Sequence, residues 1–136
     1  MKWWVTFNEP HVFAMLTYCV GAWPGASPDL MEQVSSALPR GVFEVVMKAM
    51  AAAHNQAFDV LGEEGKKKGR KTKVGVSHHV SYQRPYGLFD TPVVVISTLL
   101  TRYAFVDDVC DKCDFIGMNY YGQVGEDYYI IYHHNG

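Results

Sequence analysis

Long apolar runs are absent from this sequence of 136 residues. No stretch approaches the ~20 consecutive apolar residues that cross a bilayer, so we expect no transmembrane segment. The first residues, Met1 and Lys2, lead directly into an aromatic run without a small-residue cleavage site, which is not typical of a signal peptide.

The sequence also contains few cysteines and has a small net charge. Cys19, Cys110 and Cys113 are an odd number without a secretion signal, so we expect no disulfide framework. Cys110 and Cys113 have CxxC spacing, but a structural zinc site needs a second ligand pair, and we expect reduced thiols and no metal. The net charge of −2 argues against nucleic acid as a partner.

What the sequence does contain indicates a globular chain. Apolar residues make up 49% and aromatic residues 14%, and the length corresponds to about one domain. Six of the twelve basic residues lie within residues 66–73. Such a run can attract anionic lipid headgroups, which makes a membrane surface one candidate partner. A solvated loop between a helix and a strand is the simpler interpretation.

Apolar patterning predicts alternating strands and helices. Because strands separated by helices form parallel sheets, we expect an α/β fold. His54 lies on the apolar stripe of the long central helix, so we expect a hydrogen-bonded core histidine. The predicted elements are a buried strand over 3–7, a short helix over 11–20, a long helix over 39–61 ending at Gly62, a strand over 73–80, a helix over 91–105 whose residues 93–96 fit a strand equally well, and a strand over 114–122.

Polar and aromatic residues follow each predicted strand. Asn8 and Glu9 follow the first strand, residues 79–82 the second, and residues 119–121 the third. In parallel sheets the chemistry takes place at the carboxyl ends of the strands. The pattern therefore predicts that these residues share one face of an active site.

Glu9 is the candidate for acid–base chemistry. Aromatic neighbours are expected to bury the carboxylate and raise its pKa, as a general acid requires. Asn8 offers a donor and an acceptor for a sugar hydroxyl. Glycoside cleavage generally needs a second carboxylate. The alternative is a carboxylate that only complements a helix N-terminus.

Ordered motifs resemble glycoside hydrolase family 1, the β-glucosidase and β-galactosidase barrels. Residues 6–10 resemble T-x-N-E-P, and residues 114–121 resemble D-F-[IL]-G-[ILM]-N-Y-Y. Residues 21–25, 53–57 and 75–85 resemble the family's segments between these motifs. The resemblance implies a partial (β/α)8 TIM barrel, in which residues 1–123 form strands four to six with their helices. Residues 124–136 match no family pattern and are a tail of unclear origin.

The resemblance also implies roles for individual residues. Glu9 would be the general acid/base of a retaining reaction, and Asn8 would contact the hydroxyl next to the anomeric carbon. Tyr121 resembles the tyrosine that holds the nucleophilic carboxylate, and Asn119 lines the same pocket. Tyr82 stands where most plant β-glucosidases have a tryptophan. This chemistry requires no metal or organic cofactor.

The family's nucleophile motif, T-E-N-G, does not occur in the sequence. We therefore expect the isolated chain to be an inactive piece of a larger enzyme. Residues 15–18, 74–81 and 84–90 resemble a plant subgroup that transfers galactose between galactolipids at the chloroplast outer envelope. The resemblance implies a galactolipid or another β-glycoside as substrate. A soluble β-glucosidase and a truncated, non-catalytic product are the alternatives.

Overall fold

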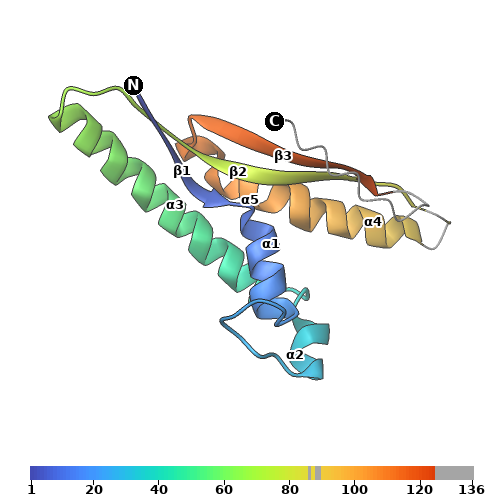
Figure 1. Ribbon diagram of the computed structural model, residues 1–136. Helices are drawn as coiled ribbons and strands as arrows, with labels where there is room; N and C mark the ends of the chain where they lie inside the picture. Colours follow the sequence, from blue (N-terminus) through green and yellow to red (C-terminus); the bar gives the residue numbers. More distant parts are fainter. Residues whose placement is uncertain (86, 88–89, 125–136) are drawn as a thin grey trace.

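The computed structural model describes residues 1–85, 87 and 90–124. Three strands alternate with helical segments along the chain, as the patterning predicts (Figure 1). The tail predicted at 124–136 lies outside the described residues, apart from the last residue of the third strand. The elements are β1 (Lys2–Asn8), α1 (Pro10–Ala14), a π-helical turn η1 (Met15–Cys19), α2 (Leu30–Ser35), α3 (Val42–Lys67), β2 (Thr72–Gln83), α4 (Thr91–Thr98), a π-helical turn η3 (Leu99–Tyr103), α5 (Ala104–Val109), a 3-10 turn η4 (Cys110–Lys112) and β3 (Phe115–Val124).

The three strands form one parallel sheet in the order β1-β2-β3. Trp4 pairs with Val74 of β2, and Val76 pairs with Ile116 of β3. The register of β1 against β2 shifts between Val5 and Asn8, and a shift of this kind changes where the following side chains point. The predicted parallel arrangement is confirmed.

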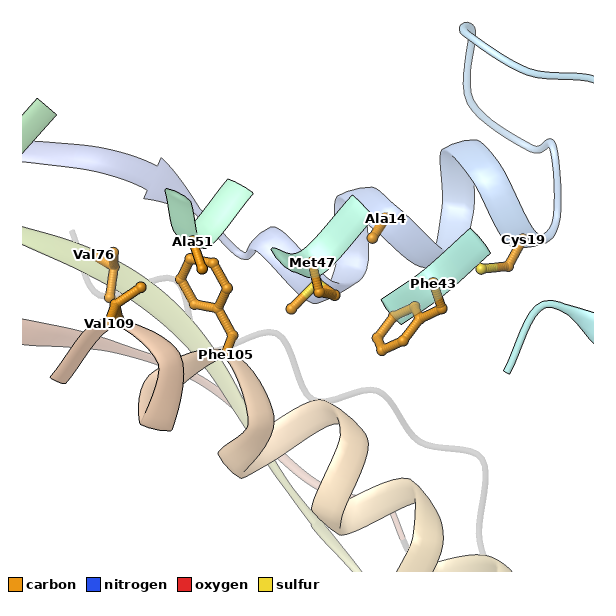
Figure 2. Packing of buried hydrophobic residues seen from close by; sticks show 8 residues of the cluster. All are labelled: Ala14, Cys19, Phe43, Met47, Ala51, Val76, Phe105 and Val109. Atoms are coloured by element: carbon orange, nitrogen blue, oxygen red, sulfur yellow. The ribbon is translucent and has the colours of Figure 1, made fainter. Parts of the chain in front are cut away.

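The core lies between the sheet and the helices on one of its faces (Figures 1 and 2). Residues from α1, η1, α3, β2 and α5 contribute to it, so residues distant in sequence hold the helices to the sheet. Burying one large apolar side chain contributes about 1.5–3 kcal/mol. The buried cluster consists of Ala14, Cys19, Phe43, Met47, Ala51, Val76, Phe105 and Val109.

The first strand forms where predicted, but it is not buried. The exposed fractions are 58% for Trp3, 44% for Trp4 and 52% for Val5. Among the described residues β1 is an edge strand, and the helices cover the neighbouring β2, where Val74 and Val76 are buried. The expectation of a buried strand over 3–7 is therefore wrong, because an apolar run indicates a strand without identifying its cover.

The long helix begins and ends later than predicted. Gly41 is the N-cap, and the helix continues through Gly62 to Lys67. Gly69, two residues beyond the last helical residue, turns the chain away with a left-handed φ of 59°. The amide of Gly69 donates to the Lys66 carbonyl at 3.1 Å and that of Arg70 to the Gly65 carbonyl at 2.9 Å, which is a Schellman motif. The expectation that Gly62 follows the helix end is wrong, because Gly69 rather than Gly62 adopts the left-handed conformation.

The basic segment over 66–73 ends α3, forms the connection over 68–71 and begins β2, so the expected loop is shorter than the segment. Lys66 and Lys67 lie in the last turn of α3, where cations complement the helix dipole. Glu64 pairs with Lys67 at 3.0 Å and with Lys68 at 3.4 Å. Lys73 lies in β2 and pairs with Asp114 at 2.6 Å. Part of the segment's charge is therefore matched locally.

The helix predicted over 91–105 begins at Thr91 and, with a π-helical turn, continues to Val109. Residues 93–96, equally compatible with a strand, are helical. Asp90 precedes the helix, and its carboxylate accepts from the Gly87 amide at 2.9 Å.

Candidate active site

The carboxyl end of β1 places Glu9 at the start of α1. Glu9 has φ 49° and ψ 56°, a left-handed conformation that is uncommon for a residue with a side chain. Its amide donates to the Ser77 carbonyl at 2.8 Å, and its carbonyl accepts from the Phe13 amide at 3.1 Å. The chain therefore turns sharply at Glu9, with its backbone bonded to β2 on one side and to α1 on the other.

Asn119 of β3 connects all three strands where β1 ends. Its amide nitrogen donates to Asn8 Oδ1 at 3.0 Å and to Glu9 Oε1 at 2.7 Å. Its amide oxygen accepts from the Ser77 hydroxyl at 2.8 Å. These three bonds use both polar ends of the amide, so they also determine its orientation.

Tyr121 completes the cluster around the carboxylate. Its hydroxyl donates to Glu9 Oε1 at 2.5 Å. Asn8, Glu9, Asn119 and Tyr121, four of the five residues singled out from the sequence, thus lie together at one edge of the sheet. Tyr82 lies in β2, and its side chain is outside the described part of the chain.

The pKa of Glu9 lies below its usual value, not above it as expected from the sequence. Partial burial acts to raise this pKa, but the hydrogen bonds from Tyr121 and Asn119 and the nearby His79 and His11 outweigh burial. The expectation of a raised pKa is wrong for this chain because these donors and histidines together favour the charged carboxylate more than burial disfavours it. The bond to Glu9 also raises the pKa of the Tyr121 hydroxyl.

His79, which the sequence places on the active-site face, lies in this cluster together with Ser77 and His11, which the sequence analysis did not single out. The ring of His79 lies 5.1 Å from that of Tyr121, and the ring of His11 stacks on His79 at 5.5 Å. Strand alternation was the available signal, because Ser77 and His79 are two residues apart and share a face. His11 lies in a helix and carried no such signal.

His54 is a hydrogen-bonded core histidine, as predicted. It is fully buried, and its Nε2 lies 2.7 Å from the Lys112 carbonyl oxygen. Because a carbonyl oxygen only accepts, the proton is assigned to Nε2, and the Thr6 hydroxyl then donates to Nδ1 at 2.6 Å. His54 thus joins α3 to β1 and η4 rather than binding a ligand.

Across residues 1–85, 87 and 90–124, no three His, Cys, Asp or Glu side chains are grouped so that they could hold a metal ion. No helix among these residues has the length and apolarity needed to cross a membrane.

Known proteins are similar to this chain over most of its length and not only at the sequence motifs. Two curated plant proteins are similar to this chain: Beta-glucosidase-like SFR2, chloroplastic, of Oryza sativa subsp. japonica, with 54% identity over 123 residues, and Galactolipid galactosyltransferase SFR2, chloroplastic, of Arabidopsis thaliana, with 55% identity over 120 residues. The matches cover 90% and 88% of this chain but 19% of each relative. The chain therefore spans about a fifth of the length of these relatives.

A solved structure and a family model agree with these matches. The crystal structure of Fpglu1 from Fervidobacterium pennivoraus superposes with a TM-score of 0.64 and 28% identity, over 87% of this chain and 23% of that chain. The model of glycosyl hydrolase family 1 matches residues 1–95, which is well over half of the sequence. The chain, with its parallel sheet and its polar strand ends, belongs to glycosyl hydrolase family 1.

Proposed function

We propose that this chain forms strands four to six of a (β/α)8 barrel whose retaining glycosyl-transfer reaction uses Glu9 as general acid/base. The observation that carries the proposal is the convergence of Asn119 and Tyr121 on the Glu9 carboxylate just past the carboxyl end of β1, with Asn8 bonded to the same Asn119 amide. Catalytic groups of such barrels lie at this end of the sheet. Family membership supports both the barrel and the reaction class.

The proposed reaction has two steps. A nucleophilic carboxylate, contributed by a part of the barrel outside this chain, attacks the anomeric carbon, and Glu9 protonates the departing glycosidic oxygen. Glu9, now ionised, removes the proton from the acceptor hydroxyl as that oxygen attacks the anomeric carbon and displaces the nucleophilic carboxylate. The proton that Glu9 gives in the first step is thus recovered in the second.

The second carboxylate also bears on the pKa of Glu9. In a retaining enzyme the two carboxyl groups lie about 5–5.5 Å apart. Two like charges at this separation disfavour each other, which raises the pKa of the group that is to act as acid. The lowered pKa of Glu9 in this chain is consistent with a site that still needs its second carboxylate.

We propose a second galactolipid as the acceptor and a chloroplast location for the protein, because both plant relatives are named chloroplastic and one is named a galactolipid galactosyltransferase. Galactose then moves from one galactolipid to another, and diacylglycerol leaves with the proton from Glu9. The rice relative is named β-glucosidase-like, and hydrolysis of β-glucosides is the second candidate function.

A test uses a polypeptide in which this chain lies within a complete barrel. Incubation with monogalactosyl lipid should yield digalactosyl lipid and diacylglycerol, whereas release of free galactose or glucose would favour hydrolysis. Glu9→Gln should lower turnover of the lipid by about 10²–10⁴-fold, since it removes the general acid.

An activated glycosyl donor and an anionic acceptor separate the general-acid role of Glu9 from its general-base role. In an aryl glycoside with a strongly acidic phenol, the phenolate departs without protonation. Glu9→Gln should therefore impair the first step far less with this substrate than with the lipid. Azide needs no general base, so it should restore turnover of that substrate by Glu9→Gln. Full lipid turnover by Glu9→Gln would contradict the assignment. Asn55→Ala, on the helix side of the sheet, is the matched control.

A further inference from the structure

Ser77 is bonded to the candidate acid/base residue directly and through one other side chain. It lies in β2, the middle strand, where it pairs with Asn8 of β1 and with Gly117 of β3. Its carbonyl oxygen accepts from the Glu9 amide at 2.8 Å. Its hydroxyl donates to Asn119 Oδ1, also at 2.8 Å. Each of these groups belongs to the segment from β1 to β3, so this network needs no group from elsewhere in a barrel.

The Ser77 hydroxyl favours one of the two ways in which the Asn119 amide can face. A side-chain amide accepts through its oxygen and donates through its nitrogen. With Oδ1 bonded to the hydroxyl, the nitrogen lies 2.7 Å from Glu9 Oε1 and 3.0 Å from Asn8 Oδ1. While Glu9 is ionised, its carboxylate only accepts, so the hydroxyl and the carboxylate favour the same orientation.

The hydroxyl matters most when Glu9 is protonated, which is the state in which a general acid acts. A protonated carboxyl group carries one O–H donor and can also accept. If the Asn119 amide were reversed, its oxygen would accept that proton, and the proton would be directed at Asn119 instead of at a departing glycosidic oxygen. With the amide nitrogen on Oε1, this oxygen is the acceptor and the proton is carried by Oε2.

We propose that Ser77 is a positioning residue, whose hydroxyl holds the Asn119 amide so that Glu9 carries its catalytic proton on Oε2. The consequence for the proton rests on the proposed role of Glu9 as general acid, whereas the hold of the hydroxyl on the amide stands on the hydrogen bonds alone. Tyr121 has no part in this arrangement and stays available to the second carboxylate of a complete barrel.

Ser77→Val and Ser77→Thr are a matched pair of variants. Both residues are β-branched and suit a strand, but only threonine keeps the hydroxyl. Gly117 lies opposite, and even a Cβ placed there would be 3.6 Å from Ser77 Oγ, so the glycine leaves space for the additional methyl group. The bond from the Glu9 amide to the carbonyl of residue 77 is available to both variants, because it involves the backbone alone.

The variants are compared in the polypeptide that contains a complete barrel. Ser77→Val should lower kcat/KM for monogalactosyl lipid by about three- to tenfold, which is the effect of one lost hydrogen bond. For an aryl glycoside with a strongly acidic phenol, kcat/KM should change by less than about twofold, because the phenolate departs without a proton. The limb of the pH–rate profile assigned to Glu9 should move to higher pH, since the bond from Asn119 lowers the pKa of Glu9. Ser77→Thr should keep the native rates and profile.

Neutron diffraction locates the amide hydrogens and therefore tests the hold on Asn119 directly. The amide nitrogen should lie on Glu9 Oε1 in Ser77→Thr and should have left it in Ser77→Val. In an Asn119→Ala background, Ser77→Val should have no further effect on kcat/KM. If Ser77→Val does not fold, Ser77→Ala takes its place.

Three results would overturn the role of Ser77. They are equal losses with the lipid and the aryl glycoside, an undiminished loss in the Asn119→Ala background, and an unmoved amide in Ser77→Val. Full lipid turnover by Glu9→Gln would instead contradict the proposed function, and the neutron structures would still decide whether Ser77 orients Asn119.

Discussion

Glu9 adopts a backbone conformation that is costly for a residue with a side chain. A left-handed residue other than glycine is destabilised by about 1–2 kcal/mol, and such residues persist where their surroundings hold them. Here Ser77 and Phe13 bond to the Glu9 backbone from two directions. The turn at Glu9 allows its carboxylate to meet Asn119 and Tyr121 across two neighbouring strands. The strain is thus linked to the position of the candidate acid/base.

Replacing Tyr121 by Phe should raise the pKa of Glu9 in this chain, because the hydroxyl is a principal cause of its lowering. A carboxylate with a lowered pKa adds stability above its ordinary value of 4.5, and this contribution is lost as pH falls through the folded pKa. Tyr121→Phe should therefore destabilise the fold at pH 7 and have less effect at pH 3. A ¹³C NMR titration of the Glu9 carboxyl measures the first effect, and urea unfolding at both pH values measures the second.

Tyr120→Phe is the matched control for this experiment. Tyr120 is the preceding residue of β3, it lies on the opposite face of the sheet, and its side chain is 59% exposed. Its substitution should leave the Glu9 titration unchanged. An unchanged titration in Tyr121→Phe as well would contradict the bond between the hydroxyl and the carboxylate.

At the scale of elements, one glycine within α3 and one just past its C-terminal end have opposite roles. Gly69 has φ 59° and ends the helix, whereas Gly62 lies inside it. A Cβ at either position would meet no atom within 4 Å, so packing does not distinguish them. Only the backbone conformation does, which makes the pair a clean comparison.

Gly69→Ala should destabilise the chain by about 1 kcal/mol, because alanine is strained at positive φ. Gly62→Ala should stabilise it by about 0.5–1 kcal/mol, because alanine favours the helix interior. Urea unfolding monitored by circular dichroism measures both values. Equal effects of the two substitutions would show that α3 does not end at Gly69 in solution.

At the scale of the whole molecule, the two ends of the sheet have different chemistry. Lys2 pairs with Thr72 at one end of β1, and Glu9 follows the other end. The seven residues of β1, at about 3.3 Å each, separate these ends by about 20 Å. The basic residues of 66–73 therefore lie at the end of the sheet opposite to Glu9. They cannot bind the sugar that Glu9 would act on.

Replacing Lys66, Arg70 and Lys71 together by Gln should leave KM for galactolipid in neutral detergent micelles within about twofold, because exposed charges beyond a Debye length of about 8–10 Å are screened. Asn8→Ala, at the Glu9 end, should raise KM in the same assay. A large rise in KM with the triple variant would place the basic segment at the substrate site after all.

The described helices do not cover all strands of the sheet equally, and apolar side chains of β3 are exposed. Ile116, Met118 and Tyr120 pair in register with Val76, His78 and Val80 of β2 and face the same side of the sheet. Val76 and His78 are buried under the helices, whereas the β3 residues are 48–71% exposed. The described helices thus cover β2 and leave β3 open on this side. That the isolated chain is inactive remains a prediction.

The sequence by itself determined the strands, their parallel order and the edge at which chemistry is expected. Local patterns suffice for this, because apolar runs, turn residues and the motif around Glu9 are encoded over a few neighbouring positions. The core role of His54 followed from its place on an apolar stripe. Asn8, Asn119 and Tyr121 were likewise identified from strand ends and motifs.

The tertiary structure alone decided the exposure of β1, the end of α3 at Gly69, the lowered pKa of Glu9 and the stacking of His11 on His79. The exposure, the pKa and the stacking depend on groups far apart in sequence. The helix end depends on the φ angle, which differs between Gly62 and Gly69. Burial of a strand requires its cover, and the pKa of a carboxylate depends on every donor that reaches it. Local sequence does not contain these distances, and packing sets them.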